Sequence, residues 1–177
     1  MLNSLITSQT RIKLLLKFFL NSNTKAHLRG LESEFGESTN GIRVELNRLE
    51  QAKLLKSTKS GNRKFYQANT DHPLFKDIHN IVLKETGIDR IIERVISRTG
   101  DILRVYLTGS FARGLNSNFI DLIIVGDNID REYLDRKVVQ ASKLTERHIR
   151  YQLLSAGEED EMLKRINRDE LLVLWNG

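Results

Sequence analysis

One stretch, from Thr108 to Gly126, constrains the fold of this chain more than any other; it reads TGSFARGLNSNFIDLIIVG. The apolar run Leu103–Leu107 leads into it, and a second apolar run, Leu122–Val125, closes it. Short apolar runs bounded by turn residues predict buried strands. A Gly-Ser turn between two strands lets backbone N–H groups approach an anion. The stretch therefore predicts a small α/β unit with a turn suited to phosphate.

The rest of the C-terminal half continues this pattern. From residue 101 onward, apolar runs alternate with helical stripes, which predicts an α/β unit built on a mixed sheet. The expected strands are 103–107, 120–125 and 148–154, with an apolar ending at 171–175. The expected helices are 110–114, 131–144 and 157–167.

The first 70 residues carry three helical stripes followed by a hairpin pattern. The helices are predicted over 9–20, capped by Ser8; from Thr24 to a C-cap at Gly36; and from Ser38 or Thr39 to Ala52. The tight glycine turn between the second and third helices is typical of a helix-turn-helix. A Ser-Gly-Asn turn within residues 59–64 then predicts a β-hairpin. The fold class expected for the whole chain is α+β.

Charge is spread unevenly along the chain. Residues 1–70 hold 12 Lys and Arg against 5 Asp and Glu, a balance of +7, whereas residues 71–177 hold 16 against 18, a balance of −2. A basic segment on a near-neutral remainder favours a polyanionic partner for that segment. A solvated basic surface without a ligand would give the same count.

The third helix and the hairpin supply the candidate DNA-binding residues. The stripe Ile42, Leu46 and Leu49 predicts the inner face of that helix, so the polar residues between them face outward. Arg and Asn suit base edges, Ser and Thr at a helix start suit a phosphate, and basic hairpin residues suit the DNA backbone. The predicted set is Ser38, Thr39, Asn40, Arg43, Asn47, Lys59, Asn62, Arg63 and Lys64.

The segment from Leu28 to Asn69, LRGLESEFGESTNGIRVELNRLEQAKLLKSTKSGNRKFYQAN, resembles an ArsR-type winged helix. In that family the third helix enters the major groove and the hairpin wing lies against the backbone. The resemblance implies a transcriptional regulator that binds double-stranded DNA. A homodimer is expected because two half-sites multiply the affinity of a domain that makes few contacts alone.

A second resemblance rests on Gly109-Ser110, Ala112-Arg113-Gly114 and Asp121-Leu122. Over residues 103–154 the chain resembles the minimal nucleotidyltransferases of the polymerase-β type. Active members hold two divalent metals with an Asp-x-Asp pair and a third carboxylate from a later strand, because phosphoryl transfer needs metal charge on both reacting oxygens.

This chain departs from that pattern at two of the three acidic positions. Phe119 stands where the first aspartate belongs, and residues 148–154 contain no acid. The resemblance therefore implies a degenerate domain with no catalytic residue and no metal ligand assigned. Nucleotide or phosphate binding stays open, with Gly109, Ser110, Arg113 and Asp121 as the candidate residues and a nucleotide or Mg²⁺ as the candidate cofactor. A retained turn without a ligand is the competing interpretation.

Together these patterns predict three segments: a winged-helix DNA-binding domain at 1–70, a connecting or dimerisation helix at 71–99, bent at Gly87, and a nucleotidyltransferase-like domain at 100–177. The expected function is a DNA-binding transcriptional regulator whose second domain senses a nucleotide effector or dimerises. The alternatives are an active nucleotidyltransferase that docks its substrate through the winged helix, and a protein-interaction adaptor. The lack of cysteine fits a cytoplasmic location, and no apolar run approaches the roughly 20 residues of a membrane helix.

Overall fold

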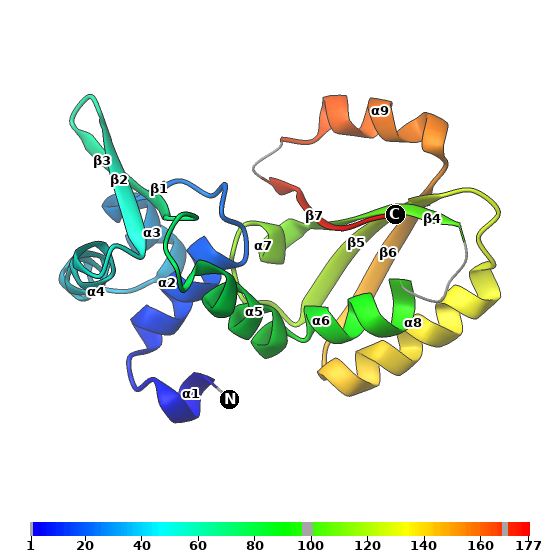
Figure 1. Cartoon of the computed structure of the whole chain (residues 1–177), viewed down its shortest axis with the longest axis horizontal. Coiled ribbons are helices and arrows are strands. Elements are labelled where there is room, and N and C mark those ends of the chain that lie inside the picture. The colour runs from blue at the N-terminus through cyan, green and yellow to red at the C-terminus, as the bar shows by residue number, and fades with distance from the viewer. Residues whose placement is uncertain (1, 97–100, 168–169) are drawn as a thin grey trace. The chain divides into compact units, whose positions relative to one another are not determined.

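The computed structural model describes residues 2–96, 101–167 and 170–177. The chain divides into two compact units, Met1–Glu85 and Thr86–Gly177, and each is described by itself (Figure 1). The division falls inside the segment 71–99, for which the sequence predicts a connecting or dimerisation helix. No helix within the described ranges is long and apolar enough to cross a membrane.

The segment 71–99 is helical but interrupted. It contains α5 (Phe75–Thr86), α6 (Ile88–Ile91) and the π-helical turn η1 (Ile92–Ile96). Gly87 separates the first two with a φ of 78°, a left-handed conformation that other residues rarely adopt. The predicted break at Gly87 is confirmed. Residues 97–99 of the predicted helix lie outside the described residues.

The N-terminal unit begins with helices and ends, before α5, in a hairpin. Its elements are α1 (Leu2–Leu5), α2 (Gln9–Phe19), β1 (Ala26–His27), α3 (Leu28–Phe35), α4 (Thr39–Gln51), β2 (Leu55–Ser60) and β3 (Arg63–Ala68). The three strands form an antiparallel sheet in the order β1-β3-β2. The predicted N-caps of α2 and α4 are confirmed, because the hydroxyls of Ser8 and Ser38 accept hydrogen bonds from backbone N–H groups three residues later.

The start of the second helix differs from the prediction. Helix α3 begins after His27, whose side chain accepts a hydrogen bond from the Gly30 N–H at 3.0 Å, and not at Thr24. Residues 26 and 27, predicted as helical, instead pair with β3 as the short strand β1. Backbone hydrogen bonds to β3 thus replace the first turn of the expected helix. The C-cap at Gly36 is as predicted, with a φ of 65°.

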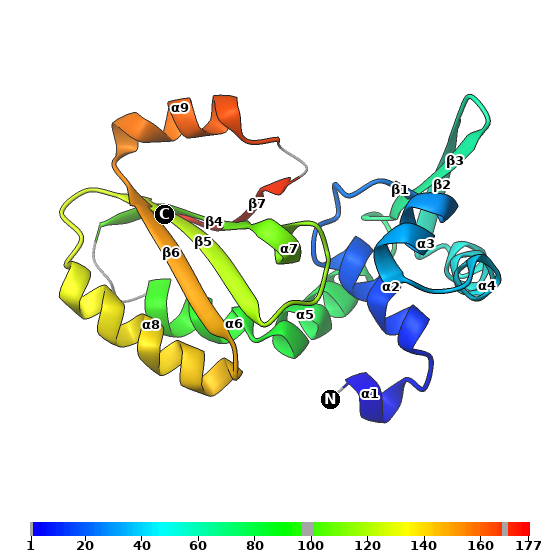
Figure 2. The ribbon, with the colours of Figure 1, turned by 180° about the vertical axis from the view of Figure 1, so that it is seen from behind.

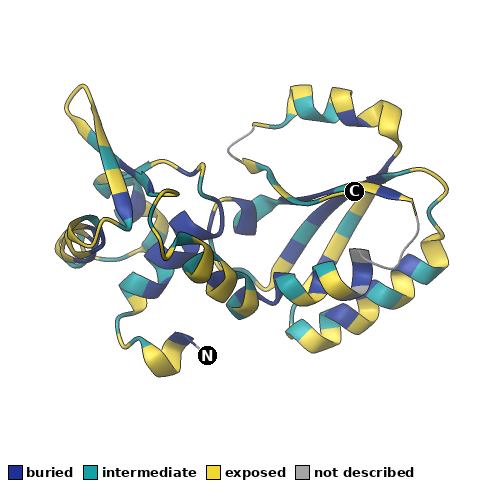
Figure 3. Ribbon diagram, viewed as in Figure 1, coloured by how far each residue is buried: buried dark blue, intermediate teal, exposed yellow. Residues whose placement is uncertain are grey.

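The core of this unit lies between α2, α3 and α4 (Figure 3). Its fully buried side chains include Leu14, Phe18, Phe19, Leu20, Leu31, Ile42 and Leu46. The inner face predicted for the third helix is confirmed, since Leu49 is also buried. The opposite side of α4 is left to solvent.

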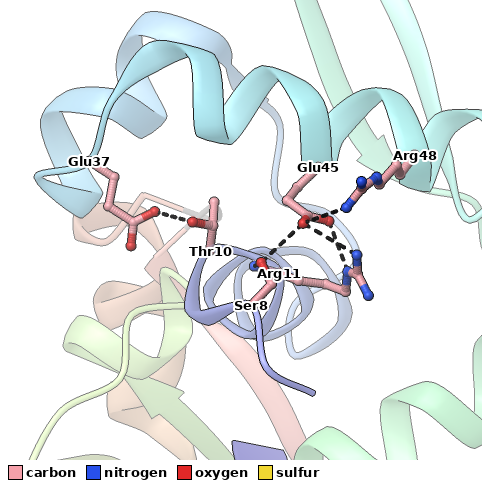
Figure 4. A network of polar contacts seen from close by, with 6 residues as sticks. All are labelled: Ser8, Thr10, Arg11, Glu37, Glu45 and Arg48. Atoms are coloured by element: carbon pink, nitrogen blue, oxygen red, sulfur yellow. Dashed lines mark hydrogen bonds and ion pairs between the residues drawn. The ribbon is translucent and has the colours of Figure 1, made fainter.

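A buried glutamate joins α4 to the start of α2 (Figure 4). The carboxylate of Glu45 accepts hydrogen bonds from Arg11 Nε at 2.8 Å, Ser8 Oγ at 3.0 Å and Arg48 Nη1 at 3.2 Å. Its side chain is only 7% exposed. Glu45 therefore faces α2 and adds no negative charge to the outer face of α4.

These contacts make the N-terminal unit sensitive to acid. Burial by itself would raise the pKa values of Glu37 and Glu45, but hydrogen bonds from Lys13 and Thr10 to Glu37, and from Arg11 and Ser8 to Glu45, outweigh burial and lower both. A lowered folded-state pKa contributes stability above the unfolded pKa that is lost as the pH falls through the folded-state pKa.

We therefore expect the free energy of unfolding of residues 2–85 to fall as the pH drops below about 4.5, the ordinary glutamate pKa. Urea unfolding at several pH values, followed by the amide NMR signals of α4, measures this. The variant Glu37→Gln/Glu45→Gln should show a flatter pH profile. An unchanged profile in that variant would contradict the assignment.

The C-terminal unit is a mixed four-stranded sheet with helices (Figure 2). Its further elements are β4 (Ile102–Thr108), α7 (Gly109–Ala112), β5 (Phe119–Gly126), α8 (Arg131–Thr145), β6 (His148–Leu154), α9 (Ala156–Arg165) and β7 (Leu172–Asn176). The strand order is β6-β5-β4-β7. Strands β5 and β6 are parallel, joined through α8, and the other pairs are antiparallel. The predicted mixed sheet is confirmed.

The two faces of the sheet carry different helices: α9 lies over one, and α6 and α8 lie over the other (Figures 1 and 2). Tyr106, Ile123, Val125 and Leu154 pack against α9. Because side chains alternate along a strand, Phe119 and Asp121 share the face of Ile123. By the same period, His148 and Arg150 share the face of Leu154. These four side chains therefore lie on the α9 face, near the start of β5.

A polar network holds α9 on the sheet. Glu159 of α9 is buried and accepts hydrogen bonds from Arg104 Nε and from the Tyr106 hydroxyl, each at 2.5 Å. Burial and the hydrogen bond to Glu159 raise the pKa of Tyr106 to about 12. The pKa of Glu159 is lowered, and the hydrogen bond from Arg104 is the largest cause. The carboxylate therefore remains charged and fixes the position of α9.

Candidate functional site

A basic cleft in the N-terminal unit is lined by three elements that follow one another in the sequence. It has a volume of about 750 Å³ and lies between α4, the β2–β3 hairpin and the start of α3. The lining residues are His27, Leu28, Arg29, Arg43, Asn47, Asn62, Arg63, Lys64 and Tyr66. Four of them are Lys or Arg and none is acidic. The cleft is therefore suited to an anionic ligand.

Three of the cleft's cations have no partner within the part of the chain that the structure describes. Arg29, Arg43 and Arg63 are exposed, and their guanidinium groups form no hydrogen bond or ion pair with any described residue. The basic residues of α2 behave differently: Arg11, Lys13 and Lys17 pair with Glu45, Glu37 and Glu34. The positive charges of α2 are thus neutralised by acids of the same chain, whereas those of the three arginines in the cleft remain available to a ligand.

The fourth cation ties the hairpin to α4. Lys64 Nζ donates to Oε2 of Glu50 at 2.7 Å, and Ser57 Oγ donates to Oε1 of the same carboxylate at 2.5 Å. These hydrogen bonds lower the pKa of Glu50, and the bond to Glu50 raises the pKa of Lys64, so both remain charged. One carboxylate of α4 therefore contacts both strands of the hairpin and fixes one wall of the cleft against the other.

Five of the nine predicted DNA-binding residues line this cleft: Arg43, Asn47, Asn62, Arg63 and Lys64. The remaining four lie nearby in the fold but outside the lining. Ser38 caps α4, Thr39 and Asn40 form its first turn, and Lys59 stands opposite Lys64 in the hairpin register. Their contact with DNA stays a prediction.

Four residues of the cleft were not predicted: His27, Leu28 and Arg29 at the start of α3, and Tyr66 on β3. Arg29 lies outside the apolar stripe of Leu31 and Phe35, which is the sequence signal that could have placed it on the surface. His27 could not be placed from its spacing, because its position depends on the pairing of β1 with β3. Its ring packs edge-on against Phe65, with 5.2 Å between ring centroids.

The second site lies where β4 meets α7 in the C-terminal unit. Gly109 has a φ of 66°, and a Cβ atom there would lie 2.7 Å from Oδ2 of Asp121. Any larger residue would therefore collide with the aspartate and would be strained as well. Gly109 and Asp121, two of the candidate phosphate-binding residues, therefore lie close together, and their contact with a ligand stays a prediction.

The surroundings of Asp121 do not suit a divalent metal. Arg150 Nε lies 2.6 Å from Oδ1 of Asp121, and its guanidinium stacks over the ring of Phe119, 4.4 Å from the centroid. The parallel register places Arg150 opposite Asp121 and His148 opposite Phe119. The hydrogen bond to Asp121 raises the pKa of Arg150 further, so the cation is permanent.

A metal ion bound to Asp121 would lie beside the positively charged Arg150 guanidinium instead of beside a second carboxylate. Two positive charges that close together repel each other. Within residues 2–96, 101–167 and 170–177, no three His, Asp or Glu side chains group as metal ligands. The side chains of Phe119 and Arg150 therefore do not fit the two-metal site that the nucleotidyltransferase resemblance implies.

A pocket of about 360 Å³ opens beside this ion pair. Its lining residues are Thr108, Asp121, Leu122, Ile123, Arg150, Tyr151, Gln152 and Ile166. Of the four residues predicted to bind phosphate, Asp121 lines the pocket. Gly109 and Ser110 begin α7, and Arg113 follows it as its C-cap. Their contact with a ligand stays a prediction.

Comparisons with known proteins give limited similarity. No family model matches the chain, and no curated protein matches it. One similar solved structure is a "putative nucleotidyltransferase from Sulfolobus solfataricus", 23% identical over 52% of this chain and 79% of that one, with a TM-score of 0.33. Another is a "toxin-antitoxin with AMP-PNP", 17% identical over 54% and 75% of the chains, with a TM-score of 0.38. Both TM-scores are low, so neither likeness assigns a function to this chain.

Proposed function

We propose that the N-terminal unit is a winged helix that binds double-stranded DNA, and that the protein regulates transcription. The observation that carries the proposal is the basic cleft, in which Arg29, Arg43 and Arg63 have no partner among the described residues. The order α2, β1, α3, α4, β2, β3 and the sheet order β1-β3-β2 support the winged-helix assignment. In such a domain α4 would be the recognition helix and the hairpin the wing.

The residue types of the cleft support recognition of bases as well as of the backbone. Arg43 and Asn47 lie four residues apart on the exposed side of α4 and line the same cleft. Arginine pairs with guanine and asparagine with adenine through two hydrogen bonds in the major groove. Arg63 and Asn62 on the hairpin would contact the phosphate backbone beside that groove.

The C-terminal unit would serve this regulator as a non-catalytic, nucleotidyltransferase-like module for sensing or dimerisation. Phe119 and the Asp121–Arg150 pair disfavour the competing proposal of an active transferase, because two of the needed carboxylates are replaced. Leu74 and Ile81, in the predicted dimerisation segment 71–99, are 53% and 41% exposed. Exposed apolar residues there favour a homodimer.

The dependence of binding on salt tests the proposal. Fluorescence anisotropy of the full chain with a labelled duplex of about three helical turns, roughly 30 base pairs, gives the affinity. The slope of log K against log salt should be about −3 per bound unit, since three unpaired arginines each displace about one counterion. The same sequence on an uncharged peptide backbone is the control and should not bind. Absence of binding at low salt, or affinity that salt does not change, would refute the proposal.

A further inference from the structure

Arg150 is held in one orientation by two neighbours on β5. Its Nε donates to Oδ1 of Asp121 at 2.6 Å, and the ring of Phe119 lies under its guanidinium. A guanidinium has five N–H donors, of which Nε supplies one. The Nη1 and Nη2 groups form no hydrogen bond with the described residues. The donor face that pairs with phosphate or carboxylate in two parallel hydrogen bonds is therefore unused.

This oriented cation borders a space that a small ligand can enter. The pocket of about 360 Å³ beside it has Thr108 and Gln152 as polar neighbours and Ile123 and Ile166 as apolar ones. Gln152 lies two residues after Arg150 on β6, so both side chains lie on the α9 face of the sheet. Ile166 follows directly after α9, and Glu159 holds α9 on the sheet. The side of the pocket that Ile166 forms is therefore in place without a ligand.

The neighbours of Asp121 determine which ligand chemistry is allowed. A divalent metal would be repelled by Arg150 and would find Phe119 where it needs an oxygen ligand. A phosphate group meets the opposite situation, since Asp121 already uses Nε to orient the guanidinium and leaves the Nη atoms to an incoming oxyanion. We propose that the pocket at Arg150 binds a phosphate group without a divalent metal, the guanidinium supplying the charge that a metal would otherwise provide.

Isothermal titration of the full chain with ATP and with inorganic tripolyphosphate tests the proposal. Both titrations are done in EDTA and repeated with excess Mg²⁺. Binding is expected in EDTA and should be weaker with Mg²⁺, because the metal neutralises the phosphate charge. Equal affinities for the two probes would support recognition of phosphate alone, and tighter ATP binding would support recognition of a nucleotide. Binding that requires Mg²⁺, or no binding in EDTA, would overturn the proposal.

Variants separate this pocket from other basic surfaces. Arg150→Gln should weaken binding about tenfold or more, since a charge-assisted pair of hydrogen bonds is lost. Arg165→Gln is the matched control, because Arg165 is also exposed and paired with one acid, Glu161, and it should bind as the unaltered chain does. Equal affinity in the Arg150→Gln and unaltered chains would exclude the pocket as the site.

The DNA-binding cleft could itself attract ATP, so the titration is repeated in an Arg43→Ala/Arg63→Ala variant. Phosphate binding at Arg150 should persist there unchanged, whatever happens to DNA binding. Loss of ATP binding in this variant would assign the phosphate to the cleft and refute the proposal.

Trp175 fluorescence shows whether the Arg150→Gln variant is folded. The variant Arg150→Lys, which keeps the charge without the planar fork, provides a second test. Arg150→Lys should bind less tightly than the unaltered chain, and equal affinity would contradict the bidentate geometry.

Discussion

Replacing Arg43 and Arg63 together by alanine is expected to weaken binding of the full chain to duplex DNA about 100-fold at low salt. Each arginine that contacts a base edge or a phosphate contributes about 1–3 kcal/mol, and the two side chains come from opposite walls of one cleft. The salt slope should also fall, by about one for each phosphate contact removed. Fluorescence anisotropy over a range of salt concentrations gives both quantities.

The matched control is the variant Arg136→Ala/Arg165→Ala, which removes the same charge from the C-terminal unit. Both residues are exposed, with side chains 63% and 79% accessible, so this variant should bind DNA nearly as well as the unaltered chain. Similar losses in the two double variants would mean that net charge, and not the cleft, drives binding. Because Arg43 and Arg63 have no partners among the described residues, the first variant should keep its fold.

Replacing Phe111 by alanine should have the largest effect on stability, about 3–5 kcal/mol lost from the free energy of unfolding of the C-terminal unit. Phe111 is 1% exposed and anchors α7, the helix that follows the Gly109 turn. Removing its ring leaves a cavity at the point where β4, α7 and β5 meet. Urea unfolding followed by the fluorescence of Trp175, the single tryptophan, reports on this unit because Trp175 lies in β7.

Phe119→Ala is the control for that measurement. Phe119 is 42% exposed and contacts the Arg150 guanidinium and the His148 ring, so about 1 kcal/mol or less should be lost. Equal losses for the two phenylalanines would contradict the assignment of Phe111 to the core. A small loss for Phe111 would imply that α7 contributes little to the stability of the sheet.

Much of the fold could be predicted because local pattern fixes it. The Ser8 cap, the Gly36 and Gly87 breaks and the strand at 148–154 depend on a few adjacent residues, and the structure contains each of them. The loss of the first acid could be recognised because Phe119 stands two residues before Asp121, where an Asp-x-Asp pair has its first aspartate.

Features that depend on pairing between distant segments could not be predicted. Arg150 lies beside Asp121 only because β5 and β6 pair in one parallel register across an intervening helix. His27 lies in the cleft only because β1 pairs with β3. Glu45 is buried because Arg11 and Ser8 on α2 donate hydrogen bonds to its carboxylate, and the pattern of α4 alone does not show these partners. A substitution can be recognised from sequence, whereas its new partner must be found in the fold.

The attachment of both hairpin strands to Glu50 has a consequence for the kinetics of association. A groove whose two walls are already joined loses little conformational freedom when a ligand enters it, so the entropic cost of binding is small. Such a preorganised surface can associate at a rate set by diffusion and electrostatic attraction, without waiting for a loop to become ordered. Differences in affinity among DNA sequences would then appear mainly in the dissociation rate, so the lifetime of the complex would distinguish a specific site from random duplex.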